Sequence, residues 1–245
     1  MIMKTKKSAM MAVSLASLLF APSVFASLYD GSLSFPLGLY ESGSGGEFKV
    51  VTSSLGTFQT FCLEQHEDIA YPPTGPYDYV INSGAVQGGG VAGGANAIDP
   101  HTGLTMDNLS IGTAWLYSQF RAGTLANYFS ANRTANAGVL QNAFWELEGE
   151  LPYDANNTYI AAARTALSLT DAQLQLDSNG AYGVVALNLF NGPYSQQVWS
   201  PALNQYVYLN QDMLAVVPEP ATMLAGALLL LPFGASTIRI LRRKQ

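Results

Sequence analysis

The sequence has one cysteine, two histidines and few charged residues, which occupy only 11% of its 245 positions. A single cysteine cannot form an internal disulfide, so covalent cross-linking within the chain by that route is excluded. Basic residues are scarce in the centre of the chain: residues 28–217 contain four of them against 16 carboxylates, a net charge of −12. Such an acidic surface repels phosphate backbones, which argues against nucleic acid as a partner.

Apolar residues make up 49% of the chain. This proportion allows one or two domains with a hydrophobic core, and it argues against disorder over most of the length.

The first 26 residues are typical of a secretory signal peptide. Three lysines within the first seven residues precede an uncharged apolar run at 8–20, and small or apolar residues follow up to Ala26. Because this run is too short to span a bilayer comfortably, we expect cleavage after Ala26 rather than a retained anchor. The chain is therefore predicted to be exported.

The last 28 residues combine an apolar segment with a basic end. Residues 221–238 are uncharged and rich in leucine, and four basic residues follow them. This length suits one transmembrane helix whose basic end stays on the cytoplasmic side. A buried C-terminal helix of a soluble domain is the alternative, and it leaves the basic end unexplained.

Pro218, Glu219 and Pro220 come directly before this segment. The order of Pro-Glu-Pro, apolar run and basic end resembles the PEP-CTERM sorting signal of exported Gram-negative proteins. The resemblance implies an exosortase, a membrane cysteine protease, as the partner that processes the tail near this motif. It also implies inner-membrane tethering by the C-terminal helix, then a location at the cell surface or in an exopolysaccharide-containing extracellular matrix.

Residues 27–217 are predicted to form one α+β domain, a β-barrel or sandwich with a helical insert. Strand patterns fall at residues 32–40, 48–51, 57–63, 182–190, 198–199 and 206–209. Helices are expected through residues 115–120, 140–148 and 161–167, with caps at Asp107 or Asn108, Asn132 or Thr134, and Asn156 or Asn157. The glycine-rich stretch 84–103 lacks the Lys and Ser/Thr of a phosphate-binding loop.

Cys62 needs an explanation, because a lone cysteine is unusual in a chain sent to an oxidising compartment. It is a buried small apolar side chain, a partner for another chain's cysteine, a protease nucleophile, or half of another covalent bond. A protease needs a histidine base, for which the chain offers His66 and His101. No Cys-His protease motif surrounds Cys62.

Gln141 gives the last of these interpretations a chemical partner. The core-facing stripe of its expected helix consists of Ala137, Leu140, Phe144 and Leu147. Gln141 and Trp145 are four residues apart and share the adjacent face, at the edge of the apolar surface. A thiolate held against a carboxamide can displace ammonia and leave a thioester, which survives only where water is excluded.

Two short sequences resemble the halves of the bacterial Cys-Gln thioester domain found on surface adhesins. They are Phe61-Cys62-Leu63-Glu64 and Gln141-Asn142-Ala143-Phe144-Trp145. The family has an aromatic-Cys motif on an early strand and a Thr-Gln-x-Ala-hydrophobic-Trp motif opening a helix; here Leu140 stands in place of the Thr. The resemblance implies a thioester between Cys62 and Gln141, in a pocket formed by Phe61, Ala143 and Trp145.

Such a bond would make the protein a single-use covalent adhesin, not an enzyme, with no cofactor and no metal. An amine on a partner protein or matrix component would attack the Gln141 acyl carbon and release Cys62. The acidic surface would favour cationic, lysine-bearing partners at low salt. The alternatives are a non-covalent exopolysaccharide-associated matrix protein and an envelope hydrolase that uses carboxylates.

Two further groups of residues have more than one interpretation. Glu146, Glu148 and Glu150 suggest a metal or acid-base site, but alternate residues on a helix point apart, which favours a solvated helix end. Tyr71, Tyr77 and Tyr79 with Asp78 suit either a sugar-binding surface or ordinary packing.

Overall fold

The computed structural model describes residues 28–36, 40–42, 45–69, 76–87, 97–193 and 195–217. The predicted signal peptide, the sorting motif and apolar tail 218–245, and Tyr71 lie outside these residues. In the part of the chain that is described, no helix has the length and apolar character needed to cross a membrane.

Eight antiparallel strands form the main sheet, in the order β10-β11-β9-β5-β1-β3-β2, with β4 also paired to β3. They are β1 (Gly31–Ser34), β2 (Tyr40–Ser42), β3 (Gly45–Thr52), β4 (Gly56–Thr60), β5 (Tyr77–Asn82), β9 (Val184–Phe190), β10 (Gln196–Ser200) and β11 (Gln205–Val216). The strand expected over residues 32–40 is divided into β1 and β2. Pro36 follows β1, and proline cannot donate to a sheet ladder.

A second sheet consists of three short strands in the order β6-β8-β7. They are β6 (Gly84–Val86), β7 (Ala97–Ile98) and β8 (Thr105–Asn108), and β6 lies beside β9. Asp107 and Asn108 belong to β8, so the prediction that they cap a helix is wrong. Their ladder bonds to β6 occupy the backbone at the position where a cap would begin.

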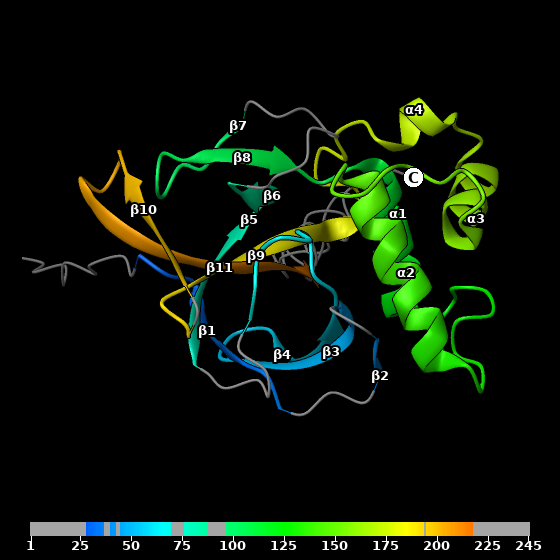
Figure 1. Cartoon of the computed structure of the whole chain (residues 1–245), viewed down its shortest axis with the longest axis horizontal. Coiled ribbons are helices and arrows are strands. Elements are labelled where there is room, and N and C mark those ends of the chain that lie inside the picture. Colours follow the sequence, from blue (N-terminus) through cyan, green and yellow to red (C-terminus); the bar gives the residue numbers. More distant parts are fainter. Residues whose placement is uncertain are drawn as a thin grey trace, which may run out of the picture.

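The helices lie between β8 and β9 in the chain and gather at one end of the sheets (Figure 1). They are α1 (Ile111–Ala122), α2 (Arg133–Leu147), α3 (Thr158–Leu167) and α4 (Asp171–Leu174). Ser110 caps α1 by accepting from the N–H of Thr113, and Asn157 caps α3 by accepting from the N–H of Tyr159. The mostly antiparallel architecture with a helical insert agrees with the predicted α+β class.

Helix α2 packs against β2 and β3 and buries the apolar face expected from its sequence. Its core-facing residues Ala137, Leu140, Phe144 and Leu147 are all completely buried. They join a cluster of aromatic rings in which Phe61 lies 5.2 Å from Phe144 and 5.0 Å from Phe120, centroid to centroid. Each large side chain buried in this way contributes about 1.5–3 kcal/mol to folding.

The start of α2 is anchored to β3 by an ion pair. Arg133 Nη2 lies 2.6 Å from Glu47 Oε1, and the Tyr128 hydroxyl donates to Glu47 Oε2 at 2.8 Å. The Arg133 guanidinium also lies over the ring of Tyr40, 4.3 Å from its centroid. These contacts fix the position of the start of α2 relative to β2 and β3.

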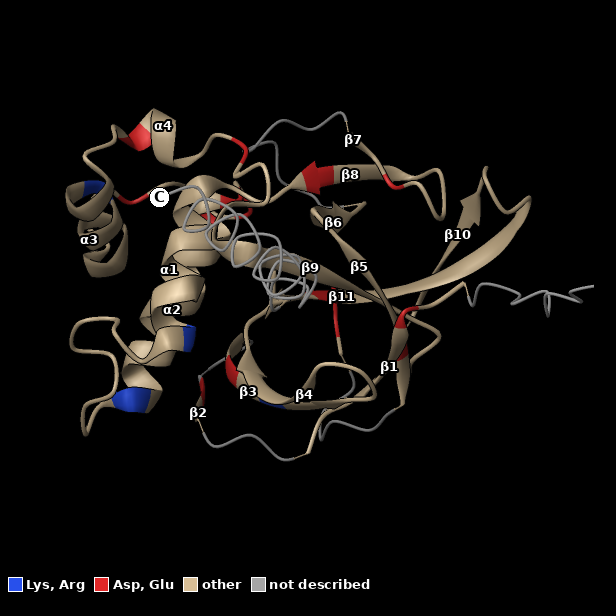
Figure 2. Cartoon of the chain, turned by 180° about the vertical axis from the view of Figure 1, so that it is seen from behind, with Lys and Arg blue, Asp and Glu red and all other residues tan. Residues whose placement is uncertain are grey.

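Basic side chains in the described residues are few and lie mostly in helices (Figure 2). Arg121, Arg133 and Arg164 are in α1, α2 and α3, and Lys49 is on β3. Acidic side chains are spread over both sheets and the helical end. Seven of the 16 carboxylates are nevertheless buried, so much of the negative charge lies inside the folded domain and not on its surface: Glu47, Glu64, Asp99, Asp107, Glu146, Glu148 and Asp212.

Candidate functional site

Cys62 follows β4 at the point where the chain meets β11. It forms an antiparallel bridge with Met213, and the N–H of Leu63 donates to the carbonyl of Asp212 at 2.9 Å. The register of β11 against β9 shifts between Asn210 and Met213, which marks a β-bulge. The main chain around Cys62 is thus held on one side by an irregular part of β11.

Side chains alternate along this segment between two parts of the core. Cys62 shares a buried cluster with Trp145 and Met213, whereas Phe61 and Leu63 belong to the cluster beneath the helices. This alternation is what an extended chain imposes. Of the residues predicted to form the pocket, Trp145 lies in the same cluster as Cys62, and Phe61 and Ala143 lie in the other.

Gln141 reaches the main chain of Cys62 from α2. Its Oε1 accepts from the N–H of Cys62 at 3.1 Å and from the N–H of Gly46 at 3.2 Å. Its Nε2 donates to the carbonyl oxygen of Cys62 at 2.8 Å. The side chain of Gln141 is 1% exposed and that of Cys62 is 3% exposed. The carboxamide is therefore buried and held at both ends.

Helix α2 begins after Asn132, one of the two caps expected from the sequence, but Gln141 lies further along it than in the family motif, where the Gln opens the helix. Because α2 begins at Arg133, Gln141 lies in its third turn and not near its start. About two helical turns precede Gln141 in α2, and they place Arg133 where it pairs with Glu47.

Gly45 is the neighbour that lets Gln141 fit. A Cβ atom at this position would lie 2.6 Å from Cγ and 3.0 Å from Cδ of Gln141, closer than side-chain atoms pack. Strand β3 approaches the glutamine as only glycine permits. The run Ser42-Gly43-Ser44-Gly45-Gly46 predicts a turn from its composition. Nothing local to this run indicates Gln141, which is 95 positions from Gly46.

The thiol of Cys62 lies in an unfavourable place for a negative charge. Burial raises the pKa of the Cys62 thiol, and the negative charge of Asp68 raises it further. The side chain is therefore a neutral thiol and not a free thiolate. The indole Nε1 of Trp145, in the same cluster, is buried with no hydrogen-bond partner among the described residues.

The structure places the two histidines apart from a Cys-His arrangement. His101 Nδ1 lies 3.2 Å from Asp99 Oδ1, and His66 lines a cleft. Across the described ranges, no hydrogen bond joins either ring to Cys62. This geometry does not support the protease interpretation.

The three glutamates at the end of α2 have separate surroundings. Glu148 Oε1 accepts from the N–H and hydroxyl of Ser110, at 3.2 and 2.8 Å, and burial raises its pKa to about 7. Glu150 accepts from the N–H of Gln65, and burial raises the pKa of Glu146. They point apart, as expected, but they are not a solvated helix end: Glu146 and Glu148 are buried.

Tyr77 and Tyr79 are completely buried, and Asp78 accepts from the side chain of Asn191 at 2.8 Å. These tyrosines pack in the core, so they do not form a sugar-binding surface.

No protein-family model matches the sequence, and no curated protein is detectably similar to it. Among solved structures, the N-terminal thioester domain of fibronectin-binding protein SfbI from Streptococcus pyogenes is similar, with a TM-score of 0.36 and 13% sequence identity. The match covers 78% of this chain and 95% of the other. A likeness at this score carries no argument, so function must be inferred from the geometry of the chain itself.

Proposed function

We propose that Cys62 and Gln141 form an internal thioester, through which an exported surface protein attaches covalently to amine groups on a partner. The observation that carries this proposal is the placement of the Gln141 carboxamide. It is buried and hydrogen-bonded to the main chain of Cys62 through both its oxygen and its nitrogen. Two residues 79 positions apart are thus in direct contact in a site closed to water.

Formation of the bond can use the backbone donors that already contact the Gln141 carboxamide. The Cys62 sulfur adds to the Gln141 side-chain carbon, and negative charge develops on Oε1. The N–H groups of Cys62 and Gly46 point at this atom and stabilise the charge, as an oxyanion hole does. The carbon–nitrogen bond then breaks, and ammonia leaves with the proton of the thiol.

Burial acts on the two stages in opposite directions. A raised thiol pKa makes the thiolate scarce, which slows formation of the bond. Exclusion of water protects the product from hydrolysis, which is the requirement for an activated acyl group to persist. We therefore expect slow formation during or after folding and a long lifetime afterwards.

Attachment consumes the bond. The nitrogen of a partner amine attacks the Gln141 acyl carbon, the carbon–sulfur bond breaks, and the amine proton passes to the sulfur. The products are an amide link to the partner and a free Cys62 thiol. One molecule reacts once, so this is binding chemistry without turnover. The negative net charge of the domain favours lysine-bearing partners.

The place of action is inferred from the sequence. The signal peptide directs export, and the motif Pro218-Glu219-Pro220 with its apolar tail tethers the chain to the inner membrane. Exosortase processing at that motif would then deliver the protein to the cell surface or extracellular matrix of a Gram-negative bacterium.

The decisive experiment is the intact mass of the purified protein before and after treatment with methylamine. The untreated chain should be lighter than its sequence by one ammonia and should have no titratable thiol. Methylamine should add one equivalent and release one thiol. The thioester would be refuted by a mass equal to that of the full sequence, together with one thiol that titrates once the protein is denatured.

Two neighbouring amides on α2 provide a matched pair of variants. Gln141→Ala should leave a free thiol and no adduct, whereas Asn142→Ala, at an exposed position on the same helix, should behave as the wild type. Adduct formation that survives Gln141→Ala would assign the reactive carbonyl to another residue.

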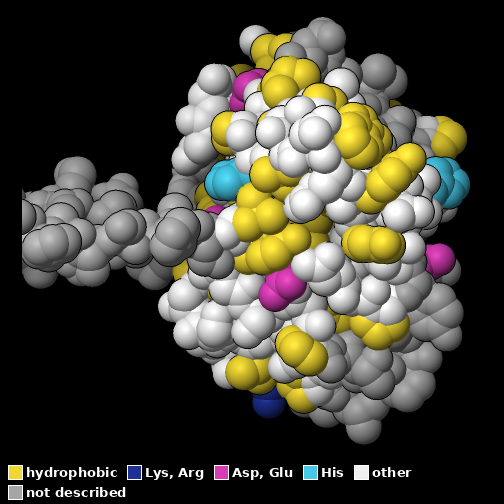
Figure 3. Space-filling view, turned by 90° about the vertical axis from the view of Figure 1, so that its left-hand side faces the viewer, with side chains coloured by type: hydrophobic (Ala, Val, Ile, Leu, Met, Phe, Trp, Pro, Cys, Tyr) yellow, Lys and Arg dark blue, Asp and Glu magenta, His cyan; other side chains and the backbone are white. Residues whose placement is uncertain are grey.

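A second candidate, non-covalent polysaccharide binding, is favoured by the exposed aromatic side chains of the β10–β11 hairpin. Trp199, Tyr206 and Tyr208 are 46%, 56% and 43% exposed, and Trp199 opposes Tyr206 in the ladder. Hydrophobic side chains gather on this end of the molecule (Figure 3). Affinity electrophoresis in neutral and acidic polysaccharides should show retardation that Trp199→Ala abolishes and Phe129→Ala, an exposed aromatic on the helical end, does not.

A further inference from the structure

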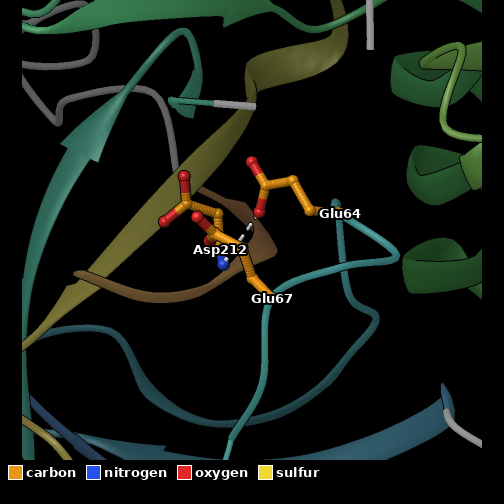
Figure 4. Close-up of side chains that lie close together, drawn as sticks. All are labelled: Glu64, Glu67 and Asp212. Carbon is orange, nitrogen blue, oxygen red and sulfur yellow. Dashed lines mark hydrogen bonds between the residues drawn. The ribbon is translucent and has the colours of Figure 1, made fainter. Parts of the chain in front are cut away.

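Three carboxylates converge beside the Cys62 segment. One carboxylate oxygen from each of Glu64, Glu67 and Asp212 lies within 4.8 Å of the other two. Figure 4 shows the three groups turned toward one another, two from the loop that follows Cys62 and one from the bulge of β11. The bulge is what points Asp212 inward, because it breaks the register of β11 at that residue.

Asp212 is fixed as an acceptor by three donors. Its Oδ2 accepts from the N–H of Val86 at 2.6 Å and from Asn188 Nδ2 at 2.7 Å, and its Oδ1 accepts from the N–H of Leu189 at 3.2 Å. Donors around both oxygens favour the ionised carboxylate, but burial and the charge of Glu67 outweigh them and raise the pKa of Asp212 well above its usual range. The second sheet and β9 thus hold one ligand group rigidly in place.

The two glutamates present oxygens that the described protein does not satisfy. Glu64 is 2% exposed, and its Oε2 accepts from the N–H of Asp212 at 3.2 Å. Its Oε1 is buried with no hydrogen-bond partner, and the same holds for Oε2 of Glu67. A buried polar atom left in this state costs about 1–3 kcal/mol, and more when it is charged. Burial also raises the pKa of both side chains, that of Glu67 to about 7, so these oxygens call for a proton or a cation.

Basic side chains do not neutralise the cluster. Among the described residues, Arg133 pairs with Glu47, Arg164 pairs with Asp171, and Arg121 lies over the ring of Phe58. The remaining basic residue of the domain, Lys49, is exposed on β3. Buried like charges within a few ångströms repel strongly, so this cluster must hold either protons or a cation.

We propose that Glu64, Glu67 and Asp212 bind a divalent cation that prefers oxygen ligands, with Ca²⁺ the first choice. Carboxylate oxygens are the ligands of Ca²⁺ and Mg²⁺, and the cluster contains no thiol and no imidazole. Ca²⁺ holds oxygens at roughly 2.3–2.6 Å, so ligands on opposite sides are about 5 Å apart, which the observed spacing fits.

The cation has a route to the site. Glu67 also lines a cleft of ≈ 280 Å³ whose other walls are His66, Asp68, Gln196, Leu209 and Asn210. Three protein ligands leave several positions of a six- to eight-coordinate ion to water, which this cleft can supply. Glu64 and Asp212 close the inner side of the site, and Glu67 stands at its entrance.

Binding would join two segments that position Cys62. Glu64 is two residues after Cys62, and Asp212 directly precedes Met213, the bridge partner of Cys62. A cation between Glu64 and Asp212 would fix the main chain of Cys62, to which the Gln141 side chain is hydrogen-bonded. The site does not depend on the thioester, since none of its ligands takes part in that chemistry.

The test measures thermal unfolding and calcium binding of the full chain after removal of metal with EDTA. Saturating Ca²⁺ at about 100 times its dissociation constant should raise the unfolding midpoint by roughly 5–10 °C, and titration calorimetry should give one ion per chain. Mg²⁺ in the same titration distinguishes the two ions.

For Glu64→Gln and Glu67→Gln, the difference in stability from the wild type should change sign when Ca²⁺ is added. Without metal, each variant should be at least as stable as the wild type, because one repulsive charge is gone. With Ca²⁺, the wild type should be the more stable protein. Asp154→Asn, which removes an exposed carboxylate that is not part of the cluster, should keep the full calcium response.

Three results would overturn the proposal. One is the absence of saturable binding of both ions to the wild type, which would assign shared protons to the cluster. Another is an undiminished calcium response in Glu67→Gln. A third is a calcium response lost equally in Asp154→Asn. If Glu64→Gln fails to fold, the proposal is still tested by the number of ions bound per wild-type chain and by the calcium response of Glu67→Gln.

Discussion

Replacing Gly45 with alanine tests whether the glutamine is held where the structure places it. The added Cβ would meet Cγ of Gln141 at 2.6 Å and both Cδ and Oε1 at 3.0 Å. Ordinary carbon–carbon contacts are about 3.5–4.0 Å, so the side chain must move by roughly 1 Å. The backbone of Gly45 does not have the positive φ that restricts a position to glycine, so strain comes from the contact alone.

The expected magnitude follows from the bonds that this movement disturbs. Gln141 makes three buried hydrogen bonds, two of them to Cys62, and leaving such groups unpaired costs about 1–3 kcal/mol each. Overpacking a tight interior costs about 1–3 kcal/mol. Because the side chain can partly re-form its bonds, we expect Gly45→Ala to lower the free energy of unfolding by about 2–4 kcal/mol.

Urea unfolding and intact mass should be measured on the same preparation. Gly45→Ala should unfold at a lower urea concentration and should lose the ammonia deficit of the wild type. Gly56→Ala is the control, because its Cβ meets open space and only its φ of 77° is unfavourable, for about 1 kcal/mol. Its ammonia deficit should be unchanged. A Gly45→Ala protein with wild-type stability and mass would refute the placement of Gln141.

Three other changes have defined outcomes. Cys62→Ala should fold with a loss of about 1–3 kcal/mol, seen in urea unfolding, because alanine leaves only a small cavity; failure to fold would make Cys62 a structural core residue. Glu148→Gln should be more stable than the wild type at pH 8 by roughly 3 kcal/mol and equal to it below pH 4.5. Because the pKa of Glu148 is raised to about 7, the folded wild type holds this proton more tightly than the unfolded chain does. The stability of the wild type therefore falls as pH rises from 4.5 to 7. A stability difference between the two proteins that does not change with pH would refute this. Deleting residues 242–244 should impair membrane retention or processing, measured by fractionation, because the stop-transfer charge is lost; normal processing would count against the sorting signal.

Local patterns in the sequence determined the helical end of the domain and half of the candidate site. The 3.6-residue periodicity of α2 placed Leu140 and Phe144 in the core, with Gln141 and Trp145 on the neighbouring buried face. These assignments succeed because each depends only on residues within a few positions of one another.

Contacts between distant segments were decided by the tertiary structure. Gly45 is a turn residue in the sequence, and only the approach of α2 makes it the one residue type that fits beside Gln141. Glu64 and Asp212 are 148 positions apart, and neither carries a pattern that indicates the other. The bulge in β11 brings them together, and a bulge depends on how three strands pair, which no local window of sequence contains.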